Sequence, residues 1–238
     1  MNTILHIDTS GPDALIGISQ DLKIIASKQN SQSNTHGEFV QAGVDELFRD
    51  SAMQLKDIDA IGVTMGPGSY TGLRVGLASA KGLAFALNKP LIGLSTLTLL
   101  AKAAVGHLTA TENPLVNEKQ LQVFSMIDAR RMEIFGAIYN SSLEYLAAEK
   151  AMILDEALLL ALLSNGPLIC IGSGVAKTKI LTQHADFQNS SPLFLDYSYT
   201  IHDMAALAMI KFKAADFEDL AYSGPAYLKD YYQKPLIK

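Results

Sequence analysis

The stretch from Ile61 to Leu94 constrains the fold of this chain more than any other, because it combines a strand, a glycine turn, a helix and a second strand. Its first residues, Ile61–Met65, are apolar and largely β-branched, which is typical of a buried strand. The Gly-Pro-Gly run at residues 66–68 breaks the strand, and Ser69 or Thr71 can cap the helix that follows. The stretch therefore predicts a strand–helix–strand unit of an α/β fold.

Small residues gather on one side of the predicted helix. At about 100° per residue, one narrow stripe holds Gly72, Gly76, Ser79, Leu83 and Ala86. An interior glycine costs a helix about 1 kcal/mol relative to alanine, and close approach of another helix is the usual compensation. Two interpretations stay open: packing inside the chain, since small residues also serve helix-on-sheet contacts, and a subunit interface.

The glycine turn matches neither common phosphate-binding template. It lacks the Gly-Lys-Ser/Thr of the P-loop and the third glycine of the dinucleotide fingerprint. Ser69 is not flanked as a hydrolase nucleophile in Gly-x-Ser-x-Gly would be. On these grounds the turn carries no catalytic signature.

Composition limits the class of protein. The chain has 238 residues, of which 49% are hydrophobic and 18% charged, so it can bury a large core in one large or two small domains. A net charge of -5 argues against a protein that binds nucleic acid by itself, because phosphate contacts need clustered Lys and Arg.

The only cysteine, Cys170, cannot form an internal disulfide, which indicates a cytoplasmic location. The N-terminus lacks the features of a signal peptide, and no apolar run approaches the roughly 20 residues that span a bilayer, so no membrane association is expected.

Each half of the chain begins with a predicted β-meander and continues with alternating helices and strands, which indicates an internal duplication. The meander strands are expected at residues 3–8, 14–19, 23–28, 121–127, 132–139 and near 143–148. Later strands are expected at residues 91–94 and 168–171. Further helices are expected after a Thr35/Glu38 capping box and at residues 96–105, 155–163, 175–183 and 201–214.

A polar segment, Gly106–Lys119, is the predicted boundary between lobes. Residues 1–108 would form an N-terminal lobe with partner-binding helices, and residues 109–215 a smaller C-terminal lobe. Residues 216–238 would form a tail. The tail contains Tyr227, Tyr231 and Tyr232 among lysines, a composition that suits either RNA contact or docking on the body, and the negative net charge favours docking.

Two acids stand at corresponding corners of the meanders, Asp8 and Asp128. In a phosphotransferase such acids would hold Mg²⁺ and polarise water. The alternative is that both close turns through hydrogen bonds to the backbone. Likewise, the Gly-Ser-Gly run at residues 172–174 either admits a nucleotide close to the backbone or forms a tight strand-to-helix turn.

The five histidines predict no metal site. His36 starts a helix, and a ligand pair at i and i+4 would need a second ligand at Val40, which cannot coordinate a metal.

Five segments, in this order and spacing, resemble the bacterial TsaB (YeaZ) family: Ile4–Ser10, Thr35-His36, Gly66–Gly76, Asp128–Arg130 and Pro225–Lys229. The Gly66–Gly76 segment is the most specific, and the resemblance covers nearly the whole chain. It implies an actin-like, sugar-kinase-like (ASKHA) fold of two related α/β lobes, each with a mixed sheet flanked by helices. It also implies a role in forming N6-threonylcarbamoyladenosine (t6A) at position 37 of tRNAs that read codons starting with A.

The resemblance further implies a non-catalytic subunit that pairs with TsaD, the metal-bearing transferase, and is joined by TsaE, an ATPase; TsaC makes the donor. This chain would need no cofactor, with ATP and a metal ion on the partner subunits, and would meet tRNA only through the complex. TsaD-like proteins carry His-x-x-x-His on the helix after the first meander, whereas here Val40 follows His36. Lys229 stands where arginine is common in the family, so a contact specific for guanidinium is not expected there.

Two sets of residues follow as predictions. A weak or vestigial nucleotide site would comprise Asp8, Thr9, Ser10, Asp128, Gly172, Ser173 and Gly174. A partner interface, which could also form a homodimer, would comprise His36, Val40, Val44, Leu47, Gly72, Val75, Gly76, Ser79 and Leu83. A bulky residue at Gly76 is expected to abolish pairing with TsaD and to leave the monomer folded.

The alternative function is an ATP-dependent, sugar-kinase-like phosphotransferase that uses Asp8, Asp128 and the Gly172 turn. A third possibility, a metalloprotease, would instead hold stoichiometric zinc or iron.

Overall fold

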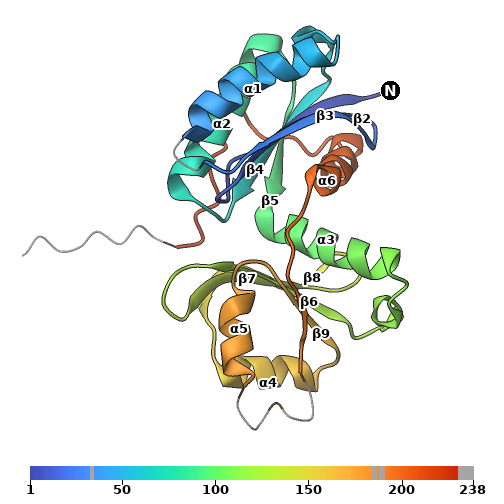
Figure 1. Ribbon diagram of the computed structural model, residues 1–238, viewed down its shortest axis with the longest axis vertical. Coiled ribbons are helices and arrows are strands. Elements are labelled where there is room, and N and C mark those ends of the chain that lie inside the picture. Colours follow the sequence, from blue (N-terminus) through green and yellow to red (C-terminus); the bar gives the residue numbers. More distant parts are fainter. Residues whose placement is uncertain (33–34, 184–186, 188–190, 230–238) are drawn as a thin grey trace, which may run out of the picture.

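The computed structural model describes residues 1–32, 35–183, 187 and 191–229, and it contains two five-stranded sheets, one in each lobe (Figure 1). The first sheet is formed by β1 (Thr3–Asp8), β2 (Ala14–Gln20), β3 (Lys23–Asn30), β4 (Ala60–Gly66) and β5 (Leu91–Ser95). The second sheet is formed by β6 (Gln122–Asp128), β7 (Glu133–Tyr139), β8 (Tyr145–Ile153), β9 (Leu168–Ile171) and β10 (Leu193–Leu195). The helices are α1 (His36–Asp50), α2 (Tyr70–Leu87), α3 (Thr96–Ala110), α4 (Glu156–Ser164), α5 (Val175–Leu181) and α6 (Ile201–Lys213).

The two sheets repeat one topology. The first has the strand order β3-β2-β1-β4-β5 and the second the order β8-β7-β6-β9-β10. In each, the first strand of an antiparallel meander pairs with a parallel strand, and that strand pairs with a second parallel strand at the edge of the sheet. The expected two related α/β lobes, each with a mixed sheet, are therefore confirmed, and so is the internal duplication.

Helix α2 forms where the glycine turn predicts it. The Ser69 hydroxyl accepts a hydrogen bond from the Gly72 N–H at 3.2 Å, which caps the first turn. Asn88 ends the helix in the left-handed conformation. Between these caps, Leu77, Ala80 and Ala84 are buried with β1 and β4 in the core of the first lobe.

Helices α3 and α6 pack across the predicted lobe boundary. Most buried residues of α3 join the core of the second sheet, where Leu100 and Ala104 lie in one cluster with Val123 of β6. Helix α6 instead packs on the first sheet, and Met204 lies in one cluster with Ile4. Each of these two helices thus packs on the sheet opposite to the one that the division into residues 1–108 and 109–215 would give it.

Two local predictions also need correction. The third strand of the second meander is Tyr145–Ile153 and not 143–148, since Asn140 accepts hydrogen bonds from the N–H groups of Ser142 and Glu144 and makes a turn there. The capping box at α1 is absent, because the Thr35 hydroxyl donates to the Gln32 carbonyl instead.

The tail returns along the first lobe. The Glu218 N–H donates to the Leu91 carbonyl at 2.8 Å, and the Ala226 N–H donates to the Met65 carbonyl at 2.7 Å. Tyr231 and Tyr232 lie outside the described residues. Among the described residues, none of the helices combines the length and the apolar character that crossing a bilayer requires.

Candidate functional site: a cleft between the lobes

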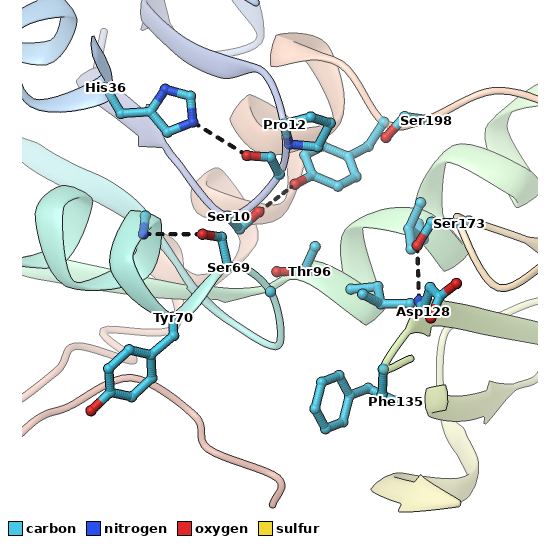
Figure 2. A pocket seen from close by; sticks show the side chains of 18 of the residues that line it. Ser10, Pro12, His36, Ser69, Tyr70, Thr96, Asp128, Phe135, Ser173 and Ser198 are labelled. Atoms are coloured by element: carbon cyan, nitrogen blue, oxygen red, sulfur yellow. Dashed lines mark hydrogen bonds between the residues drawn. The ribbon is translucent and has the colours of Figure 1, made fainter. Parts of the chain in front are cut away.

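A cleft of about 1260 Å³ opens between the two lobes (Figure 2). Its walls come from the β1–β2 corner, the first residues of α1, α2 and α3, the β6–β7 turn and the turn after β9. Residues from these walls include Ser10, His36, Ser69, Tyr70, Thr96, Asp128, Arg130, Gly172, Ser173 and Tyr199. The parallel strands of both sheets end here, and the crevice at the carboxyl ends of such strands is where α/β folds bind ligands.

Asp8 closes a turn behind the cleft wall instead of pointing into the cleft. The residue is only 4% exposed, and both of its carboxylate oxygens accept hydrogen bonds. Its Oδ1 accepts from the Ser10 N–H at 2.8 Å and from the Thr64 hydroxyl at 2.7 Å. Its Oδ2 accepts from the Tyr199 hydroxyl at 2.7 Å. These three donors use the lone pairs that a bound cation would need, so this geometry favours the turn over the Mg²⁺ site for Asp8.

Tyr199 is the main site residue that the sequence analysis missed. It lies between β10 and α6, far from Asp8 along the chain. Its phenol donates to Asp8 and therefore accepts from the Ser10 hydroxyl, which lies 3.0 Å away. Burial first, and then the charge of Asp8, raise the pKa of Tyr199 well above its usual range. The phenol consequently stays protonated and keeps donating to Asp8.

Asp128 is neutralised by a lysine of its own lobe. Its Oδ1 accepts from the Lys177 ammonium at 2.7 Å and from the Arg130 N–H at 2.6 Å. The bond from Lys177 is the main cause that lowers the pKa of Asp128, followed by the Arg130 N–H, while partial burial opposes both. Lys177 also donates to the Glu133 carbonyl at 2.8 Å, which fixes the ammonium in place. A lysine thus supplies the positive charge that balances this carboxylate.

Four of the seven predicted nucleotide-site residues line the cleft: Ser10, Asp128, Gly172 and Ser173. Figure 2 shows the Ser173 hydroxyl accepting from the Asp128 N–H, at 2.9 Å. Asp8, Thr9 and Gly174 lie behind the wall and do not line it.

Close packing accounts for the glycines after β9. Gly172 has a φ of 101°, and a Cβ there would overlap the Met126 carbonyl oxygen. A Cβ at Gly174 would lie 2.6 Å from the Cβ of Met126. This close packing favours the interpretation of a tight strand-to-helix turn.

His36 lines the cleft but has no second ligand beside it. The side chain is 6% exposed, and its Nε2 donates to the Gly11 carbonyl at 3.3 Å. Val40, one turn later on α1, is 1% exposed. Within the part of the chain that the structure describes, no three His, Cys, Asp or Glu side chains come together as metal ligands would.

A second hollow lies between α1 and α2. This α1–α2 groove has a volume of about 420 Å³. Ten residues line it: Val40, Gln41, Val44, Asp45, Phe48, Leu55, Ala78, Ser79, Gly82 and Leu83. Phe85, on the same helix α2, does not line the groove and is 82% exposed.

The nine predicted interface residues divide between three places. Val40, Val44, Ser79 and Leu83 line the α1–α2 groove. His36, Gly72 and Val75 line the cleft instead. Leu47 and Gly76 line neither hollow and are buried in the first lobe.

Gly72 and Gly76 serve packing inside the chain. A Cβ at Gly76 would overlap the Thr9 hydroxyl, and a Cβ at Gly72 would overlap the Thr9 carbonyl oxygen. The Thr9 hydroxyl donates to the Gly72 carbonyl at 2.7 Å, so β1 and α2 meet at these glycines. The expectation that a bulky residue at Gly76 leaves the monomer folded is wrong, because a leucine there would disturb this packing; a partner contact at these two glycines stays a prediction. Of the three glycines of α2, Gly82 is the open one, because a Cβ added there would have no atom within 4 Å.

The sequence is similar to proteins of t6A biosynthesis. Residues 23–236 match the family described as TsaD: tRNA N6-adenosine threonylcarbamoyltransferase. The tRNA threonylcarbamoyladenosine biosynthesis protein TsaB of Bacillus subtilis is 30% identical over 173 residues, which cover 71% of this chain and 70% of that protein. A Mycobacterium tuberculosis protein described as uncharacterized is 33% identical over 141 residues, or 58% of this chain, and the match spans 60% of that relative's length.

A solved structure shows the same fold. YeaZ from Pseudomonas aeruginosa superposes with a TM-score of 0.74 at 23% identity, covering 96% of this chain and 100% of the other. The two lobes, the glycine turn before α2 and the relationship to the Bacillus subtilis protein lead to one assignment. The chain belongs to the TsaB (YeaZ) family, and it also matches the TsaD family model.

Proposed function

We propose that this chain takes part in t6A biosynthesis as a subunit that binds a TsaD-type protein and leaves the transfer of the threonylcarbamoyl group to that partner. TsaE would join the pair in the cytoplasm. The target would be adenosine 37 of tRNAs that read codons starting with A, and tRNA would be met through the complex. ATP and a metal ion would belong to the partner subunits, so this chain would need no cofactor.

The α1–α2 groove is the observation that carries this proposal. Its floor is formed by Val40, Val44 and Leu83, and the exposed ring of Phe85 stands on the same helix. An apolar groove between two helices suits a partner that presents an apolar helix or ridge. The same surface could join two copies of this chain when the partner is absent.

The inter-lobe cleft supports the non-catalytic part of the proposal. Catalysis by a metal-bound acid pair needs carboxylates with free lone pairs. Asp8 instead accepts from three protein donors, and Asp128 is paired with Lys177. The residue one turn after His36 is Val40, which supplies no ligand.

A pair of tryptophan variants tests the partner surface. Gly82 and Gly106 both lie on exposed helix surface with no atom within 4 Å of an added Cβ. Gly82→Trp fills the α1–α2 groove, and it is expected to weaken binding of a TsaD-type protein by about 30-fold, since blocking a central contact costs about 2 kcal/mol. Gly106→Trp places the same bulk on α3, away from the groove, and should leave binding unchanged. Titration calorimetry with the purified partner measures both.

The same variants test the pathway role. Reconstituted t6A formation with TsaC, TsaD and TsaE should require this chain, tolerate Gly106→Trp and fail with Gly82→Trp. If the two variants bound the partner equally well, this would contradict the proposal that the α1–α2 groove is the partner surface. Threonylcarbamoyl transfer by this chain without TsaD would contradict the non-catalytic role.

The alternative function is an ATP-dependent phosphotransferase of the sugar-kinase type. It is favoured by the size of the cleft and by the backbone turn at Gly172 in its wall. Calorimetry with ATP and Mg²⁺ distinguishes the two functions. Tight binding with turnover by the chain alone would support the phosphotransferase and contradict the scaffold.

A further inference from the structure

The end of the described tail is anchored on helix α2 and on the glycine turn before it. Lys81 donates to the Ser223 carbonyl at 2.9 Å. The Ala226 N–H donates to the Met65 carbonyl at 2.7 Å, just before the turn at residues 66–68. These contacts hold the tail against the first lobe.

Tyr227 adds two contacts with helix α2, one through its ring and one through its hydroxyl. Its ring centroid lies 5.2 Å from that of Tyr70. Arg74 donates from Nε to the Tyr227 hydroxyl at 2.9 Å, and its guanidinium lies 4.0 Å above the Tyr70 ring. Tyr227 is 47% exposed and Tyr70 41%, so water competes for each of these contacts.

The next two residues contact the opposite lobe. Leu228 packs against the apolar cluster formed by α3 and the second sheet. Lys229 forms an ion pair with Glu133, the first residue of β7. Three consecutive residues therefore join the first lobe to the second.

This crossing lies next to residues that line the cleft. Tyr70 lines the cleft on the first lobe, and Phe135, two residues after Glu133, lines it on the second (Figure 2). In Figure 1 the last described residues of the tail lie at the left of the molecule, level with the space between the two lobes.

We propose that residues 226–229 are a strap that joins the lobes across the mouth of the cleft and limits how far the cleft opens. The strap is releasable, because an exposed ion pair, a surface hydrogen bond and an exposed ring contact are each weak and exchange readily with water. Its anchor Arg74 lies one turn from Ala78, which lines the α1–α2 groove, so a molecule bound in the groove would sit beside the strap. The strap acts on the free chain and does not depend on the proposed partner.

Distances between spin labels on the two lobes test the strap. Labels at Glu38→Cys on α1 and Ala148→Cys on β8 occupy exposed sites in opposite lobes. Cys170 is fully buried and will not compete for the label. Pulsed electron resonance should show a main short distance in the labelled chain. Tyr227→Ala and Lys229→Glu should each shift part of the population to longer distance.

A matched control and a charge exchange complete the experiment. Tyr222→Ala removes a tail tyrosine that is 90% exposed, and it should leave the distance distribution unchanged. Adding Glu133→Lys to Lys229→Glu reverses the ion pair and should restore the short distance. The strap is contradicted if Tyr227→Ala and Lys229→Glu give the same distribution as Tyr222→Ala, or if the reversed pair fails to restore it.

Discussion

Asp8 and Asp128 show how one local motif acquires two environments. Each aspartate accepts the main-chain N–H two residues later, from Ser10 and Arg130. This Asx turn is local, because the side chain reaches its own corner of the meander. The remaining contacts come from elsewhere: Tyr199 donates to Asp8 and Lys177 to Asp128. The equivalent acids are thus both satisfied, one by a neutral phenol and the other by a cation.

His6 makes the stability of the protein depend on pH at the residue scale. Its ring is fully buried in β1, and burial lowers its pKa from 6.5 to about 3. Between these two values the unfolded chain binds a proton that the folded chain does not. The free energy of unfolding therefore rises with pH in this window and falls on acidification, by up to about 1.4 kcal/mol per pH unit from this group.

The variant His6→Gln measures that contribution, because glutamine keeps a polar partner for Ser19 and does not titrate. Urea unfolding at several pH values between about 4 and 6 should show a slope shallower than that of the unchanged protein by about 1 kcal/mol per pH unit. Identical slopes would mean that the folded state protonates His6.

At the scale of the element, helix α2 makes a different kind of contact on each of its sides. Gly72 and Gly76 meet Thr9 of the first lobe, and Gly82 opens into the α1–α2 groove. Arg74 holds the tail through Tyr227. A helix that is apolar over most of its circumference must be covered on several sides, and here the sheet, helix α1 and the tail each cover one.

Two alanine variants of α2 should therefore change stability in opposite directions. Gly82→Ala has free space and lowers the entropy of the unfolded chain, so it should stabilise the protein by about 1 kcal/mol. Gly76→Ala would push the Thr9 hydroxyl off the Gly72 carbonyl and should destabilise it by about 1–3 kcal/mol. Chemical denaturation compares the two, and an increase in stability at Gly76 would contradict the packing described.

At the scale of the whole molecule, the segment before α6 joins the lobes. Tyr199 packs against both the cluster of α3 with the second sheet and the cluster of α6 with the first sheet. Its hydroxyl reaches Asp8 in the centre of the first sheet. The packing of α3 on the second sheet and of α6 on the first sheet also joins the lobes, because the core of each lobe includes a helix from the other half of the chain.

Two tyrosine-to-phenylalanine variants test this joint. Tyr199→Phe leaves the buried Asp8 without one donor and should lower the free energy of unfolding by about 2 kcal/mol, as loss of a bond to a charged group does. Tyr197→Phe removes a neutral bond of 2.7 Å to the Ala103 carbonyl and should cost about 1 kcal/mol. Urea denaturation gives both values; a smaller loss at Tyr199 than at Tyr197 would count against its role as the joint.

The sequence alone predicted most of the elements, their repeated order along the chain and the family, since hydrophobic periodicity, turn residues and the Gly66–Gly76 motif are local. It missed β10, a strand of only three residues. The tertiary structure decided which side chains and which elements contact one another. It placed Thr9 against Gly72 and Gly76, left Gly82 open, and brought Tyr199 to Asp8. It also covered α3 and α6 with opposite sheets. The physical reason is that these contacts join side chains far apart in the chain, and their pairing is fixed by the packing of whole elements and not by the local pattern.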